Sequence, residues 1–179
     1  FIYNSTEEGS SFECSNPLFT QTHRLIERAE RSNMQSVMTD CPHREKLGWL
    51  EQDNLVGPSL FYNFDMTQYC PKIIRDITDT QKQNGMVPTT APQYVSFGNL
   101  FDDSPEWGST LVIMPFQYYE QYGDSTLITR NYTAMRHYVD YLTSRSKGGI
   151  VSHGLGDWYD VVEGEKSGFC KNTPIPLVA

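Results

Sequence analysis

The densest group of chemically capable side chains in this 179-residue sequence lies between residues 40 and 51. It comprises Asp40, Arg44, Glu45, Lys46, Trp49 and Glu51. A core helix has no use for so much charge, and a plain surface loop rarely needs a Trp in its middle. We therefore interpret this stretch as part of a polar pocket between two helices.

Glu45 is the best candidate for a catalytic acid. Cleavage of a glycosidic bond needs one carboxylic acid and a second carboxylate facing it, and inverting enzymes hold the two roughly 6.5–9.5 Å apart. If the chain turns helically here, Glu45 and Trp49 share a face, and the ring would raise the pKa of the carboxyl. The positive charges of Arg44 and Lys46 would lower this pKa. The alternative role of Glu45 is a surface ion pair with one of these two residues.

The neighbours of Glu45 allow several roles. Asp40 could hold substrate hydroxyls or orient Arg44, or it could cap the next turn. His43 is interpreted as a hydrogen-bonding loop residue rather than a metal ligand, because no second His lies nearby. The sequence therefore predicts neither a metal nor a cofactor.

All three Trp residues of the chain stand beside acids in segments between expected helices. The groups are Glu45, Trp49 and Glu51; Asp103, Glu106 and Trp107; and Asp157, Trp158 and Asp160. A Trp face can stack on the apolar C–H patches of a sugar ring while carboxylates hold its hydroxyls. Packing of each loop is the alternative for any single pair, but the threefold recurrence favours a sugar pocket.

The elements that must position these residues are helices. Hydrophobic periodicity and capping signals predict five of them. The first expected helix begins at Asn16-Pro17 and ends near Ser32-Asn33, and the second runs from Glu51 to Asn63 with a kink or restart at Gly57-Pro58. The third follows Asp65 and ends at Asn84-Gly85, and the fourth bends at Pro115 and ends at Tyr122-Gly123. The fifth runs from Asp124-Ser125 to Gly148-Gly149. The expected apolar faces use Leu18, Phe19, Leu25 and Ile26 in the first helix and Leu127, Tyr132, Tyr138 and Val139 in the last.

Loops and composition complete the expected architecture. Residues 86–106 form a long loop with three prolines, and a loop of that length is usually functional. No strand pattern is visible, so we expect an all-α fold of antiparallel helical hairpins with the long loops at one end. The formal net charge of −8 without a basic run argues against a nucleic-acid partner, and no apolar run is long enough to span a membrane.

The segment Asp40-Cys-Pro-His-Arg-Glu-Lys-Leu-Gly-Trp49 resembles a signature of the bacterial α-L-rhamnosidases of glycoside hydrolase family 78. Asp103-Ser104-Pro105-Glu106-Trp107-Gly108 and Gly156-Asp157-Trp158 match two further elements of that family in the same order. The resemblance implies an (α/α)6 barrel and inverting hydrolysis of terminal α-L-rhamnose from a rhamnose-containing carbohydrate.

The same resemblance assigns roles to individual residues. It implies that Glu45 is the general acid, that Asp40 binds rhamnose hydroxyls, and that Trp49, Trp107 and Trp158 surround the sugar. Arg44, Glu51, Gln52 and Asp157 are the further substrate-binding candidates. Many members of the family carry a second substrate-binding Asp where this chain has Gln52, so Glu51, Gln52 and Asp53 compete for that role.

Nothing in the chain resembles the family's general base. We therefore expect residues 16–179 to form only the first hairpins of the catalytic domain. Residues 1–15 alternate weakly and contain Gly9-Ser10-Ser11, so we expect them to lead in from an upstream domain. The expected partner is the rest of that domain, and a homodimer is an open alternative. The rival functions are a non-catalytic helical sugar-binding module and a different (α/α)6 glycoside-active enzyme.

Overall fold

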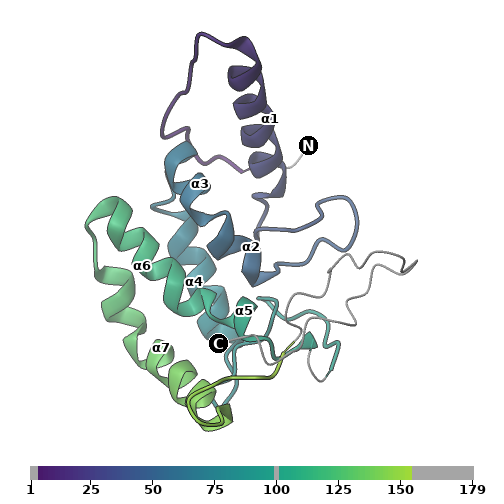
Figure 1. Ribbon diagram of the computed structural model, residues 1–179, viewed down its shortest axis with the longest axis vertical. Helices are drawn as coiled ribbons and strands as arrows, with labels where there is room; N and C mark the ends of the chain where they lie inside the picture. The colour runs from purple at the N-terminus through teal and green to yellow at the C-terminus, as the bar shows by residue number, and fades with distance from the viewer. Residues whose placement is uncertain (1–3, 99–100, 155–179) are drawn as a thin grey trace.

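A computed structural model describes residues 4–98 and 101–154, and these ranges contain seven helices (Figure 1). The helices are α1 (Pro17–Asn33), α2 (Leu50–Leu55), α3 (Gly57–Asn63), α4 (Tyr69–Thr80), α5 (Pro105–Gly108), α6 (Thr110–Tyr122) and α7 (Thr126–Arg145). Extended pairing in these ranges is confined to isolated bridges. The expected all-α class is confirmed. None of the described helices is long and apolar enough to cross a membrane.

Helix α6 is the centre of the packing. Helices α2, α3, α4 and α7 all lie against it, and α7 follows it as a hairpin after a short turn (Figure 1). The fully buried side chains of the core include Leu60, Met66, Ile77, Leu111 and Met114. This cluster joins α3, α4 and α6, so the loops that surround the candidate site extend from a packed base.

Local signals in the sequence locate several helix ends correctly. Helix α1 begins at Pro17, and the Asn16 side chain accepts a hydrogen bond from the Leu18 backbone N–H at 3.0 Å. The chain restarts at Gly57, which is the first residue of α3, after α2 has ended at Leu55. Gly123 ends α6 with a φ of 68°, a left-handed conformation that glycine adopts without strain.

Other helix ends differ from the expectation. Asp65 accepts a hydrogen bond from the Thr67 N–H in a turn of its own, and α4 begins only at Tyr69. That helix ends at Thr80 rather than at Asn84-Gly85, and α7 ends at Arg145 before the glycine pair. In both cases the glycines belong to a separate turn beyond the helix. A glycine in the sequence does not by itself show whether it ends the helix or lies in such a turn.

The expected apolar faces are partly wrong. In α1 the side chains Leu18, Phe19, Leu25 and Ile26 are exposed, whereas Glu30 is buried. In α7 Tyr132 and Val139 are exposed, and Tyr141 is buried instead. Periodicity identifies a face that is able to pack, but burial also requires a neighbour, and α6 covers only part of α7.

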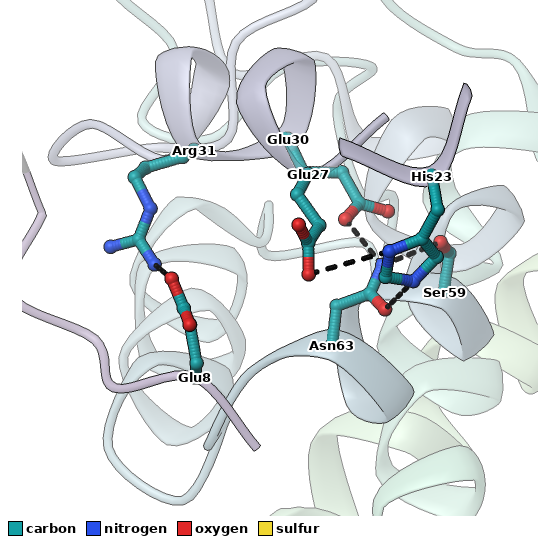
Figure 2. A network of polar contacts seen from close by, with 7 residues as sticks. All are labelled: Glu8, His23, Glu27, Glu30, Arg31, Ser59 and Asn63. Atoms are coloured by element: carbon teal, nitrogen blue, oxygen red, sulfur yellow. Dashed lines mark hydrogen bonds and ion pairs between the residues drawn. The ribbon is translucent and has the colours of Figure 1, made fainter. Parts of the chain in front are cut away.

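Polar contacts hold α1 against α3 (Figure 2). The amide of Asn63 donates from Nδ2 to the Glu30 Oε2 at 2.8 Å, and its Oδ1 lies 3.1 Å from the His23 Nε2. His23 also faces Glu27, with 3.5 Å between Nδ1 and Oε1. Because Asn63 lies in α3 and the other three in α1, this network explains how an acid of the expected outer face becomes buried.

The segment before α1 packs against the end of α3. The Gly9 N–H donates to the Asn63 carbonyl at 2.8 Å, and the Asp65 N–H donates to the Glu7 carbonyl at 2.9 Å. The Arg31 guanidinium pairs with Glu8 at 3.1 Å (Figure 2). These contacts place residues 4–15 beside α1 and α3, while the domain boundary after residue 15 stays a prediction.

Candidate active site

A cavity of about 550 Å³ collects most of the candidate site residues. Its lining consists of Asp40, Arg44, Glu45, Trp49, Glu51, Gln52, Phe97, Phe101 and Trp107. Seven of these nine are residues that the sequence singles out. Of the other candidates, Asp157 and Trp158 lie outside the described residues. The structure therefore brings residues from the segment after α1, from α2 and from the loop before α6 to one place.

The segment that carries Asp40 and Glu45 is a turn rather than a helix. The backbone N–H groups of Arg44 and Lys46 both donate to the Cys41 carbonyl, at 3.3 and 3.2 Å. Lys46 then takes a φ of 58°, which ends any helical progression. The premise that Glu45 and Trp49 share a helical face is therefore wrong. Both nevertheless line the cavity.

Trp49 is held by backbone pairing with the residues around Thr90. The Leu50 N–H donates to the Thr89 carbonyl at 2.9 Å, and the Ala91 N–H donates to the Gly48 carbonyl at 3.0 Å. A Cβ at Gly48 would lie 2.6 Å from the Ala91 carbonyl oxygen, so only glycine allows this approach. Backbone packing on both sides thus positions the Trp49 ring at the cavity.

Buried hydrogen bonds between α2 and α6 position Trp107. The Asn54 amide donates to the Thr110 hydroxyl at 2.7 Å, and that hydroxyl donates to the Leu50 carbonyl at 2.6 Å. Trp107 in the adjoining α5 is buried, and its ring centroid lies 6.5 Å from that of Trp49 in an edge-on arrangement. The two Trp side chains therefore form a continuous aromatic surface at the cavity.

The structure separates the three candidates that follow Trp49. Glu51 and Gln52 line the cavity, whereas Asp53 points into the interior and is buried. The Gln52 Oε1 is buried and accepts no hydrogen bond from the described part of the chain. A buried carbonyl oxygen in that condition can accept a hydrogen bond from a sugar hydroxyl.

Arg44 dominates the electrostatics around Glu45. Burial alone raises the pKa of the Glu45 carboxyl, but the hydrogen bond from Arg44, a backbone hydrogen bond and the Arg44 charge together lower this pKa below its ordinary value. The Arg44 Nε lies 2.9 Å from the Glu45 Oε2. In this conformation Glu45 is therefore a carboxylate at neutral pH.

Asp40, Cys41 and Glu45 form a group with the donor atoms that a metal ion needs, all within 4.8 Å of one another. Arg44 lies among them, with its Nη2 3.4 Å from the Cys41 sulfur and its Nε close to Glu45. Burial, followed by the charge of Asp40, raises the pKa of the Cys41 thiol. Arg44 therefore offsets part of the negative charge of this group.

Two aromatic residues of the site were missed by the sequence reasoning. Phe97 stacks on Trp49 with 5.5 Å between ring centroids and 18° between planes, and Phe101 lies 6.4 Å from Phe97. The length of the loop at residues 86–106 was the available signal, because it marked the segment as functional without indicating which residues matter.

Asp103 shows that an acid near a cavity-lining Trp does not always line the cavity itself. The Tyr141 hydroxyl donates to one oxygen of Asp103, and the His153 Nε2 lies 3.2 Å from the other. Asp103 does not line the cavity. It instead connects the segment just before α5 to α7 and to the segment that follows α7.

Comparison with known proteins agrees with the fold. The family described as bacterial alpha-L-rhamnosidase 6 hairpin glycosidase domain matches residues 7–179. The chain belongs to this family. The (α/α)6 architecture that the motifs imply is thereby confirmed, and the described helices are part of it.

Curated relatives carry the same name. The chain is 30% identical over 170 residues to an alpha-L-rhamnosidase of Formosa agariphila and 31% identical over 152 residues to one of Streptomyces avermitilis. These matches cover 88% and 84% of the chain. They cover only 17% and 14% of the two relatives, so the chain spans a small part of their length.

Solved structures of the family superimpose on nearly the whole chain. The alpha-L-rhamnosidase from Dictyoglumus thermophilum gives a TM-score of 0.86 at 29% identity, covering 98% of this chain and 19% of that one. The Streptomyces avermitilis enzyme in complex with L-rhamnose also gives 0.86, at 28% identity, covering 99% of this chain and 16% of that one.

Proposed function

We propose that the protein containing this chain is a glycoside hydrolase that releases terminal α-L-rhamnose, with Glu45 as its general acid. The observation that carries the proposal is the position of the Glu45 carboxyl in one cavity with Trp49 and Trp107. The membership in the α-L-rhamnosidase domain family supports the choice of sugar. The relative solved with L-rhamnose supports it further.

The geometry supplies a role for each side chain in the cavity. The sugar would pack its C–H face on the Trp49 and Trp107 rings. Asp40, Glu51 and the Gln52 carbonyl oxygen would accept hydrogen bonds from its hydroxyls. Glu45 would then deliver a proton to the glycosidic oxygen as the bond to the anomeric carbon breaks.

We further propose inversion of configuration, with the attacking water activated by a base outside this chain. Donor oxygens of Asp40 and Glu45 lie within 4.8 Å of each other on one turn. That separation is too short for the roughly 6.5–9.5 Å that an inverting pair needs to admit water. Asp40 therefore suits substrate binding better than activation of water.

The acid role is tested by the Glu45→Gln variant of the full-length protein. Loss of the proton donor should lower kcat for an aryl α-L-rhamnoside by about 10²- to 10⁴-fold, with free L-rhamnose still bound. Asp79→Asn, which changes an acid of α4 that does not line the cavity, is the control. Near-normal turnover by Glu45→Gln would refute the role.

The stereochemistry is tested separately by following the first product with proton NMR. The proposal predicts that the β-anomer of L-rhamnose forms first and then mutarotates. Initial release of the α-anomer would indicate retention. That result would favour Asp40 and Glu45 as the two catalytic carboxyl groups, since retaining enzymes hold this pair roughly 5–5.5 Å apart.

A further inference from the structure

We propose that Phe97, held in place by Asp102, forms the binding surface for the leaving group and that it selects a planar aromatic aglycone. This inference rests on the function proposed above, because it assumes that the sugar lies against the two Trp rings. Neither residue belongs to the motifs that identify the family.

The aromatic side chains of the cavity form a series from the interior to the surface. Trp107 is only 5% exposed, Trp49 is half-buried, and Phe97 is 46% exposed. Each ring contacts the next: Trp107 meets Trp49 edge-on, and Trp49 stacks on Phe97. The Phe97 ring therefore extends the Trp49 surface outward to the rim of the cavity.

The exposure of the three rings distinguishes the two ends of this series. The glycosidic oxygen must lie within reach of Glu45, and it separates the sugar from its leaving group. If the sugar occupies the buried end beside Trp107, the leaving group extends toward the exposed end. Phe97 and Phe101 are the aromatic residues that the described lining presents there.

Asp102 is the residue that positions Phe97. Its carboxylate accepts hydrogen bonds from the Phe97 N–H at 2.9 Å, from the Gly98 N–H at 3.1 Å and from the Ser96 hydroxyl. Three donors from consecutive residues fix the backbone at the point where the Phe97 side chain leaves it. Asp102 does not line the cavity, so it acts through Phe97.

A second contact holds the other side of this rim. The Thr89 hydroxyl donates to the Phe101 carbonyl at 2.6 Å, and Thr89 is itself paired with Leu50 next to Trp49. The rim is thereby connected to the same backbone pairing that positions Trp49. A preformed aromatic surface loses little entropy on binding, which suits stacking of a rigid, flat aryl group.

The experiment compares binding of the sugar alone with binding of sugar plus leaving group in the full-length protein. Phe97→Ala should raise KM for p-nitrophenyl α-L-rhamnoside about three- to tenfold, which corresponds to loss of one aromatic contact. The inhibition constant of free L-rhamnose, which has no leaving group, should stay within about twofold. Phe97→Tyr should restore the wild-type KM, because the ring is kept.

Two further variants complete the test. Asp102→Ala should also raise the KM for p-nitrophenyl α-L-rhamnoside. The kcat for this substrate and the inhibition constant of L-rhamnose should stay unchanged. Tyr94→Ala is the matched control, because Tyr94 is an exposed aromatic of the same loop that does not line the cavity. It should change none of these constants.

The outcomes separate the two proposals. If the wild-type protein does not release rhamnose, the proposed function fails and this inference fails with it. If rhamnose is released but Phe97→Ala leaves the aryl-rhamnoside KM unchanged, only this inference is overturned. An equal loss in L-rhamnose inhibition would place Phe97 at the sugar instead, and this result would also overturn it.

Discussion

The Arg44 guanidinium and the Glu45 carboxylate form a hydrogen-bonded ion pair, with 2.9 Å between Nε and Oε2. The Glu45 side chain is 25% exposed and that of Arg44 is 73% exposed, so the acid is the more buried partner of the pair. This arrangement stabilises the ionised form of Glu45, which cannot donate a proton. The protonated form needed for catalysis is therefore favoured by low pH, or by any movement of Arg44 away from Glu45.

The first prediction concerns the pH dependence that follows from this pair. A general acid is active below its pKa, so kcat/KM for an aryl rhamnoside should fall as pH rises through the pKa of Glu45. Arg44→Gln removes the hydrogen bond and charge that lower this pKa, and it should move the alkaline limb to higher pH. We also expect kcat/KM at the optimum to drop by about tenfold through lost substrate contacts.

Lys46→Gln is the control for this experiment. It removes a cation of the same turn whose exposed side chain does not line the cavity. The alkaline limb should stay where it is in the wild type. A limb that shifts equally in both variants would mean that net charge, rather than the contact with Arg44, determines the pKa of Glu45.

The second prediction concerns Gly48 as the residue that allows Trp49 to reach the cavity. In Gly48→Ala the added Cβ would meet the Ala91 carbonyl oxygen at 2.6 Å, so the backbone pairing must move apart. We expect a loss of about 2 kcal/mol of stability and at least tenfold weaker inhibition by L-rhamnose. Inhibition kinetics with L-rhamnose and a denaturant titration measure the two effects. An unchanged inhibition constant would contradict the role of this contact.

The sequence predicts those features that depend on residues close together in the chain. Asn16 and Gly123 mark helix ends because a cap bonds only to its own turn. The grouping of Asp40, Glu45 and Trp49 is likewise local, so their convergence at one cavity could be expected from a short segment.

Features that depend on distant partners could not be read in this way. Glu30 reads as a surface residue of an amphipathic helix, yet it is buried because Asn63, thirty-three positions later, meets its carboxylate. Phe97 and Phe101 read as ordinary apolar residues of a loop. They belong to the site only because Asp102 and Thr89 place their backbone beside Trp49.

The third prediction concerns the contact between Asn63 and Glu30 (Figure 2). Asn63→Ala removes the amide that donates to the buried carboxylate and that contacts His23. A buried carboxyl that loses a hydrogen bond is costly, so we expect a loss of about 2 kcal/mol. Hydrogen exchange should increase in α1 more than in α6 and α7, because this contact joins α1 to α3. The double variant Asn63→Ala with Glu30→Gln should recover part of the loss, and no recovery would contradict this explanation.

The fourth prediction concerns Asp53, whose side chain is only 2% exposed. Burial, which outweighs the opposing charge of Lys72, raises the pKa of this carboxyl well above its ordinary value. A carboxyl with a higher pKa in the folded chain binds protons on folding. Its stability contribution is therefore greatest below the unfolded pKa of about 3.9 and decreases as pH rises toward the folded pKa. Asp53→Asn should remove this decrease and add on the order of 1 kcal/mol at neutral pH. Denaturant titrations of both proteins from pH 4 to pH 8 measure the difference, and a constant difference across this range would show that the Asp53 carboxyl does not titrate there.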